Sequence, residues 1–122
     1  MRYKGTPYEI DFKDKIVFIE DVGEEQYRLD RMLSKLRLAG KLTQAKGYVL
    51  GYFTDCIASK SKREYQTTQD ILNHYIKPLG KPTIMNFASG HSFPFTTIPI
   101  GIQVEIDADE KKIVYLETFY KE

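Results

Sequence analysis

The chain has 122 residues, 42% hydrophobic and 29% charged, which is the size and composition of one globular domain. Its 18 Lys and Arg residues nearly balance 17 Asp and Glu residues, and the net charge of +1 argues against a strongly electrostatic nucleic-acid binder. A single cysteine, Cys56, excludes an intrachain disulfide and fits a reducing compartment. With no apolar leader and no apolar run long enough to cross a bilayer, we expect neither secretion nor a membrane partner.

The first half of the chain alternates between two kinds of pattern. A short β-branched apolar run at 15–20 predicts a buried strand. Residues 24–39 then carry Leu and Met at helical spacing, and Gly40 is suited to the left-handed position that ends a helix. A second apolar run at 47–53 predicts another buried strand.

A second helix and a third strand follow. Thr67 or Thr68 can cap a helix that runs to about Lys77, before Gly80. Residues 82–86 predict a third strand, with proline at its start. The order strand, helix, strand, helix, strand predicts right-handed crossovers and a parallel sheet.

The tail has a different period. Isoleucine and valine occupy every second position from 98 to 106, which predicts a strand with one face in water. Residues 107–110 predict a turn, and 111–120 predict the returning strand of a hairpin. The expected fold class is α/β, with a parallel βαβαβ layer plus an antiparallel hairpin in the single domain 1–122.

Polar residues follow each of the three predicted parallel strands, and ligands gather at that edge of such sheets. Glu20, Asp55 and His91 are therefore expected on the same edge. A glutamate at a strand end either pairs with another side chain or caps the next helix, and both interpretations stay open. His91 follows Gly90 on a loop stiffened by Pro94, which suits a general base, although a purely structural loop histidine fits equally well.

Glu20 and His91 could form two thirds of a Ser-His-Glu triad, with the carboxylate orienting the imidazole. The nucleophile is missing, because no Gly-x-Ser-x-Gly elbow occurs and the serines beside His91 lie too close to it in sequence. Cys56 has no clear activator. His74 and His91 match no common metal-ligand spacing, so we expect no metal and no cofactor.

Several short motifs follow one another in an order that resembles a known family. They are Gly5-Thr-Pro-Tyr8, Lys15-Ile-Val-Phe-Ile-Glu20, Tyr27-Arg-Leu-Asp-Arg-Met-Leu33, Gly51-Tyr-Phe-Thr-Asp-Cys56, Gly90-His-Ser-Phe-Pro94 and Thr97-Ile-Pro-Ile-Gly101. Each motif alone is moderately specific, but the ordered set is strong. Over nearly the whole chain it resembles the C-terminal domain of the LD-carboxypeptidases, also called murein tetrapeptide carboxypeptidases.

The resemblance implies a swivelling β/β/α-type domain and a serine peptidase. That family removes the terminal D-alanine of murein tetrapeptides during cytoplasmic peptidoglycan recycling, and a related branch cleaves microcin-type acyl-adenylates. Its triad is Ser-Glu-His, in which the glutamate matches Glu20 and the histidine matches His91. The family's serine and oxyanion donors lie in a separate N-terminal domain, and its members are often homodimers.

The resemblance therefore predicts that this chain supplies Glu20 and His91 to a larger peptidase and is inactive alone. Its partners would be the N-terminal nucleophile domain and the murein peptide, with a homodimer as the assembly that the family often forms. The alternative is a binding module of the same fold, in which both residues can be replaced without loss. The residues themselves select neither murein peptide nor acyl-adenylate, and they assign no role to Asp55 or Cys56.

Overall fold

The computed structural model describes residues 5–56, 66–118 and 120. Its elements, in chain order, are β1 (Ile16–Val22), α1 (Gln26–Leu38), α2 (Lys41–Gln44), β2 (Gly47–Thr54), α3 (Thr68–Ile76), the 3₁₀ turn η1 (Lys77–Leu79), β3 (Thr83–Ile84), β4 (Val104–Asp107) and β5 (Lys112–Tyr115). Within the described ranges, no helix has the length and apolar character to span a membrane.

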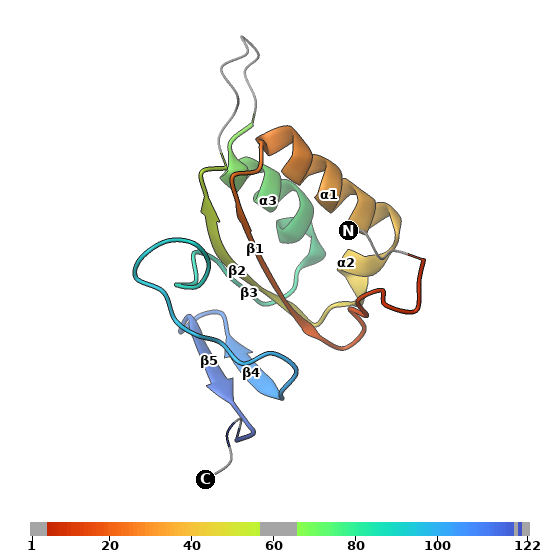
Figure 1. Ribbon diagram of the computed structural model, residues 1–122. Coiled ribbons are helices and arrows are strands. Elements are labelled where there is room, and N and C mark those ends of the chain that lie inside the picture. Colours follow the sequence, from red (N-terminus) through yellow and green to blue (C-terminus); the bar gives the residue numbers. More distant parts are fainter. Residues whose placement is uncertain (1–4, 57–65, 119, 121–122) are drawn as a thin grey trace.

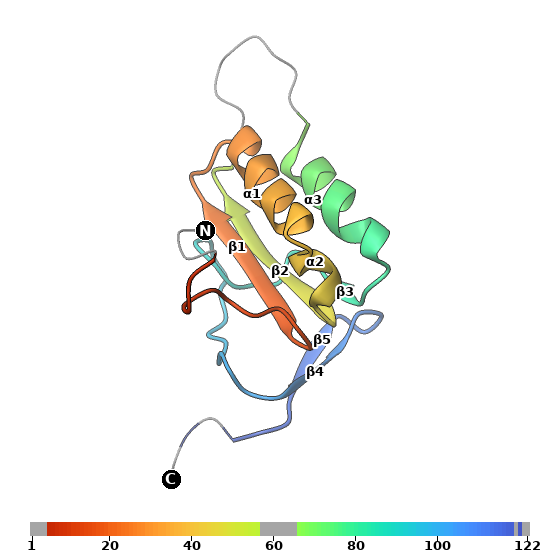
Figure 2. The ribbon, with the colours of Figure 1, turned by 90° about the vertical axis from the view of Figure 1, so that its right-hand side faces the viewer.

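The strands form two separate sheets. Three parallel strands lie in the order β1-β2-β3, and β4 pairs with β5 in an antiparallel hairpin. Helices α1 and α3 lie side by side on one face of the parallel sheet (Figure 1, Figure 2). The segment that follows β3 crosses the opposite face. The predicted α/β class, with a parallel layer and an antiparallel pair, is confirmed.

The helix ends follow capping chemistry. Helix α1 begins at Gln26, later than the pattern predicts, so its first turn holds no acidic side chain. Gly40 adopts the expected left-handed conformation, with φ at 69°, and leads into α2, whose four residues are too few to show a helical period. Helix α3 begins with a capping box, in which the Asp70 N–H donates to Thr67 Oγ1 and the Thr67 N–H donates to Asp70 Oδ2. Thr67 is therefore the cap.

The core fills the space between the parallel sheet and its helices. Its largest fully buried side chain is Tyr48 of β2, which has no exposed surface and whose hydroxyl donates to the carbonyl of Leu42 at 2.6 Å. That bond satisfies the one polar group of the ring, and burial raises the pKa of Tyr48 to about 12. The other buried members of this cluster are Phe12, Leu29, Leu33, Leu36, Leu42, Ala45, Leu50, Ile71, Leu72, Tyr75 and Ile76.

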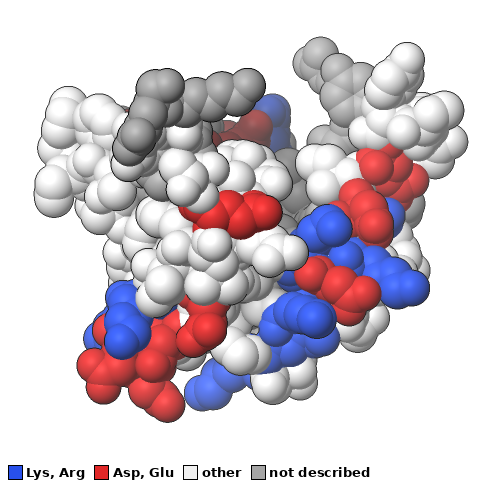
Figure 3. Space-filling view, turned by 90° about the horizontal axis from the view of Figure 1, so that it is seen from below, with Lys and Arg blue, Asp and Glu red and all other residues white. Residues whose placement is uncertain are grey.

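The tail is less regular than its alternation predicts. The predicted strand over 98–106 is mostly wrong, because only its last residues belong to β4. Pro99 has no N–H for a ladder, and Gly101 has φ at 84°, so the extended run is interrupted there. The predicted partner strand over 111–120 shortens to β5. At this end of the molecule, Lys and Arg side chains are interspersed with Asp and Glu, as the balanced charge of the chain leads one to expect (Figure 3).

The third parallel strand is also shorter than predicted. β3 covers only Thr83–Ile84 of the expected 82–86, and Asn86 adopts a left-handed conformation with φ at 54°. The chain nevertheless returns to β2, because the Phe87 N–H donates to the Leu50 carbonyl at 2.9 Å. The segment after β3 thus stays bonded to the sheet.

The register of β1 and β2 shifts in the middle of the sheet. Ile19 pairs with Leu50, whereas Asp21 pairs with Phe53, so β2 contains one extra residue opposite Glu20. Beyond such a bulge, side chains that would have pointed to one face of the sheet point to the other face. Leu50 before the shift lies in the core, and Phe53 after it packs against the core. In a regular strand, two residues three positions apart would point to opposite faces.

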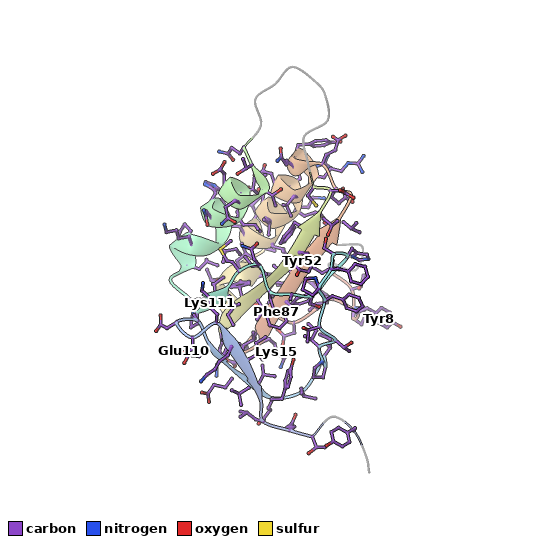
Figure 4. All side chains as sticks on the ribbon, turned by 90° about the vertical axis from the view of Figure 1, so that its left-hand side faces the viewer. Tyr8, Lys15, Tyr52, Phe87, Glu110 and Lys111 are labelled. Carbon is purple, nitrogen blue, oxygen red and sulfur yellow. The ribbon has the colours of Figure 1, made fainter. Side chains whose placement is uncertain are left out.

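The bulge residues are Gly51 and Tyr52. Tyr52 lies on the face of the sheet that is turned away from the helices, as does Phe87 of the segment that crosses this face (Figure 4). Gly51 leaves no room for a side chain, since a Cβ there would lie 2.5 Å from the carbonyl oxygen of Ser89 and 2.9 Å from the ring of Phe18. The crossing segment can therefore approach β2 closely.

Replacing Gly51→Ala should lower the free energy of unfolding by about 1–3 kcal/mol, because the added methyl group displaces the Ser89 backbone from the bulge. Urea denaturation at neutral pH measures this loss. The control is Leu38→Ala on α1, where the side chain is 81% exposed and the change should stay within about 0.5 kcal/mol. Equal stabilities of the Gly51→Ala variant and the unmodified chain would contradict the close packing described here.

Candidate active site

Two of the side chains predicted at the edge of the sheet are in contact. Nδ1 of His91 lies 3.1 Å from Oε2 of Glu20. The Glu20 side chain is 27% exposed and that of His91 is 57% exposed, so solvent reaches both. An ionised carboxylate only accepts hydrogen bonds, so Nδ1 donates and the neutral ring keeps its lone pair on Nε2. None of the residues that the structure describes hydrogen-bonds this Nε2, which leaves it open to a reacting group.

The alternation of β1 directs Glu20 away from the core. Val17 and Ile19 pack against the buried cluster between the sheet and the helices. Phe18 points to the other face, where its ring lies against Gly51, and Glu20 follows it at the next position of the same parity. The N-cap of α1 makes no side-chain hydrogen bond. Of the two interpretations left open for Glu20, pairing is therefore the one observed and helix capping is wrong.

His91 is carried by residues 89–94, which we call the His91 loop. The loop begins with a backbone bond to the bulge, in which the Tyr52 N–H donates to the Ser89 carbonyl at 2.9 Å. Gly90 follows with φ at 133°, a conformation that other residues rarely adopt. A Cβ on Gly90 would lie 3.3 Å from Oε2 of Glu20, so glycine lets the loop pass directly over the carboxylate.

Two further side chains hold the His91 loop, and the sequence reasoning missed both. The Tyr52 hydroxyl donates to the carbonyl of Pro94 at 2.7 Å. Oγ1 of Thr54 lies 2.6 Å from Oγ of Ser92. The one available signal was that both residues follow Gly51 in a motif of the resemblance, but a motif alone does not show which face of a strand its residues occupy.

Asp55 and Cys56 are not part of this contact. Asp55 is exposed in a left-handed conformation with φ at 53°, and within the described ranges no hydrogen bond or ion pair joins it to Glu20 or His91. Cys56 is buried, and burial raises the pKa of its thiol. A thiol in that state is mostly protonated at neutral pH and is a poor nucleophile.

The remaining candidates lie elsewhere or have other partners. His74 is exposed on α3, where its Nε2 lies 3.4 Å from a guanidinium nitrogen of Arg37. Ser89 is buried, and no serine hydroxyl in the described part of the chain hydrogen-bonds His91. Likewise, across the positions described, no group of three or more His, Cys, Asp or Glu residues could hold a metal ion. Within the described residues, the site thus joins a carboxylate and an imidazole, with no serine hydroxyl hydrogen-bonded to the ring.

The chain is similar in sequence to a carboxypeptidase and to a self-immunity protein. It is 40% identical over 110 residues to the "Probable murein peptide carboxypeptidase" of Bacillus subtilis (strain 168), a match that covers 90% of this chain and 34% of the relative. It is 31% identical over 108 residues to the "Microcin C7 self-immunity protein MccF" of Escherichia coli, covering 85% of this chain and 29% of that protein. The chain therefore spans about a third of the length of these relatives.

Solved structures of the same two kinds match the fold. The muramoyltetrapeptide carboxypeptidase from Oxalobacter formigenes has a TM-score of 0.70 and 31% identity, covering 84% of this chain and 36% of that one. Wild-type MccF without ligand has a TM-score of 0.78 over 97% of this chain and 35% of its own, and its 24% identity supports the fold alone. A family model described as the LD-carboxypeptidase C-terminal domain matches residues 1–106. The chain belongs to the LD-carboxypeptidase family, through the C-terminal domain of that family.

Proposed function

We propose that this chain is the C-terminal domain of a cytoplasmic serine carboxypeptidase, in which Glu20 is the orienting carboxylate and His91 the base of a Ser-Glu-His triad. The contact between Nδ1 of His91 and Oε2 of Glu20 carries the proposal. It leaves Nε2 of the ring available as a base, which is the arrangement that a serine nucleophile requires. Membership of a carboxypeptidase family supports the hydrolase class.

The proposed substrate is a murein tetrapeptide with a terminal D-alanine. Nε2 of His91 takes the proton of the serine hydroxyl as its oxygen attacks the carbonyl carbon of the last peptide bond. The imidazolium, stabilised by the Glu20 carboxylate, then gives this proton to the departing amine of D-alanine. Water attacks the acyl-enzyme in the second half of the reaction, with Nε2 again acting as the base.

The nucleophile and the oxyanion donors belong, in this proposal, to an N-terminal domain outside these 122 residues. Two observations support this assignment. No serine in the described ranges hydrogen-bonds His91, and the chain spans about a third of its curated relatives. The 122-residue chain assayed alone is then expected to release no D-alanine.

A second candidate substrate is an acyl-adenylate of the microcin type. Its support is the similarity to MccF in sequence and fold. The higher identity to the Bacillus subtilis murein peptide carboxypeptidase, 40% against 31%, favours the murein peptide. Both substrates would use the same carboxylate and imidazole, so they differ in the group that is bound and not in the roles of Glu20 and His91.

In the complete gene product that carries this domain, His91→Ala should reduce D-alanine release from a murein tetrapeptide by about 10⁴-fold or more, because the serine loses its base. The released D-alanine is measured with D-amino acid oxidase. His74→Ala is the matched control. Because the His74 ring is exposed on α3, this variant should retain full activity. Undiminished release by the His91→Ala variant would support the binding-module alternative. Cleavage of an acyl-adenylate alone would select the second substrate.

The pairing itself can be measured on this chain without any substrate. ¹⁵N NMR of the neutral ring should show the Nδ1–H tautomer as the major form of His91, because the Glu20 carboxylate accepts from it. Glu20→Ala should shift the ring toward the tautomer distribution of an unpaired imidazole, whereas Glu20→Gln, which keeps an accepting oxygen, should retain most of the effect. His74 is the internal control. An unchanged His91 spectrum in Glu20→Ala would contradict the pairing.

Cys56 should be unreactive in the folded protein. Burial raises the pKa of its thiol, so the thiolate forms only at a higher pH than in an exposed cysteine. Alkylation by iodoacetamide should therefore be slow at neutral pH, accelerate as the pH rises, and become fast at neutral pH once urea unfolds the chain. Fast alkylation of the native protein at neutral pH would contradict this and return Cys56 to the candidates for nucleophile.

A further inference from the structure

The position of His91 depends on the loop that carries it. The His91 side chain is 57% exposed, and among the described residues its ring hydrogen-bonds Glu20, so burial contributes little to holding the ring in place. A contact between two partly exposed side chains contributes too little to stability to order a loop. The His91 loop must therefore be fixed by contacts on either side of the histidine.

A backbone bond between the Thr96 N–H and the Ala88 carbonyl closes the base of the loop, and the bonds that join the loop to the sheet come from the far end of β2. The loop is bonded at Ser89 through the backbone of Tyr52, and at Pro94 through the hydroxyl of the same tyrosine, at 2.9 and 2.7 Å. Between these points, Ser92 is bonded to Thr54 at 2.6 Å. Tyr52 thus holds both ends of the loop, and Thr54 holds the residue that follows His91.

The bulge explains why one strand can do this. Because the extra residue reverses the alternation, Tyr52 and Thr54 share the face of the sheet that also carries Glu20, while Phe53 between them packs against the core. Glu20 and the two residues that hold the His91 loop therefore lie on adjacent strands of one sheet, at fixed spacing.

We propose that Tyr52 and Thr54 are positioning residues, whose hydroxyl bonds to the His91 loop keep Nδ1 of His91 against Glu20; this rests on the proposed roles of that pair. Neither residue touches the reacting atoms. Loss of either hydroxyl frees one point of the loop and lowers the fraction of molecules in which the pair is formed. The net free energy of one hydrogen bond changes the ratio of molecules with and without the pair by about two- to tenfold.

The test measures the tautomer of His91 by ¹⁵N NMR in this chain. Tyr52→Phe and Thr54→Val should each lower the ratio of Nδ1–H to Nε2–H about two- to tenfold, and Thr54→Ser, which keeps a hydroxyl, should restore it. Tyr48→Phe is the matched control. It removes a tyrosine hydroxyl from the same strand, bonded to the Leu42 carbonyl at 2.6 Å, but on the side of the core. It should lower stability to urea and leave the tautomer ratio unchanged.

The outcomes separate this proposal from the one on which it rests. If Glu20→Ala shifts the ratio but neither Tyr52→Phe nor Thr54→Val does, the pair stands and the positioning role is wrong. An equal shift in Tyr48→Phe would show general loosening of the fold and would also overturn it. If Glu20→Ala itself has no effect, both proposals fall. In the complete gene product, the two loop variants should lower kcat about two- to tenfold with KM little changed.

Discussion

The extra residue that β2 contains opposite Glu20 reverses the alternation of that strand halfway along the sheet. Before the bulge, β2 directs Tyr48 and Leu50 into the core; after it, Phe53 takes the core side. Tyr52 is thereby left on the face that Glu20 shares. Without that reversal, Tyr52 would point into the core and Phe53 would point toward the His91 loop. The candidate site therefore depends on an irregularity of the backbone as much as on its two ionisable groups.

The energetics of the pair support this view. Glu20 and His91 both lie partly in water, where even an ion pair contributes only about 0–1 kcal/mol to stability. The hydrogen bonds that join the segment after β3 to Leu50 and Tyr52 are backbone bonds to β2. Gly51 and Gly90 allow this segment to approach, since a side chain at either position would meet Ser89, Tyr52 or Glu20. The fold thus orients the pair, and the pair adds little to the fold.

Local chemistry made much of this structure predictable. The apolar run of β1, the helical spacing of α1, Gly40 at its end and Thr67 at the start of α3 all act through nearest neighbours, and all are observed. The rule that parallel strands end at one edge predicted Glu20 and His91 at the same edge, and the two side chains are in contact there.

What escaped prediction depends on contacts distant in sequence or on competing local preferences. A strand that is apolar on both faces, as β2 is, gives no sign of a bulge, because either alternation buries apolar groups. Asp55, whose backbone is in the left-handed region directly after β2, makes no hydrogen bond or ion pair with Glu20 or His91 within the described ranges. In the tail, Pro99 and Gly101 outweighed a perfect alternation of isoleucine and valine.

The bonds between β2 and the His91 loop have a mechanical consequence. Glu20, Tyr52 and Thr54 belong to one sheet, and His91 is tied to that sheet on both sides. Any rigid-body rotation of this domain against a neighbour therefore moves Glu20 and His91 together and leaves the distance between them unchanged. Under the proposed function, such a rotation alters a single critical length, from Nε2 to the hydroxyl it deprotonates.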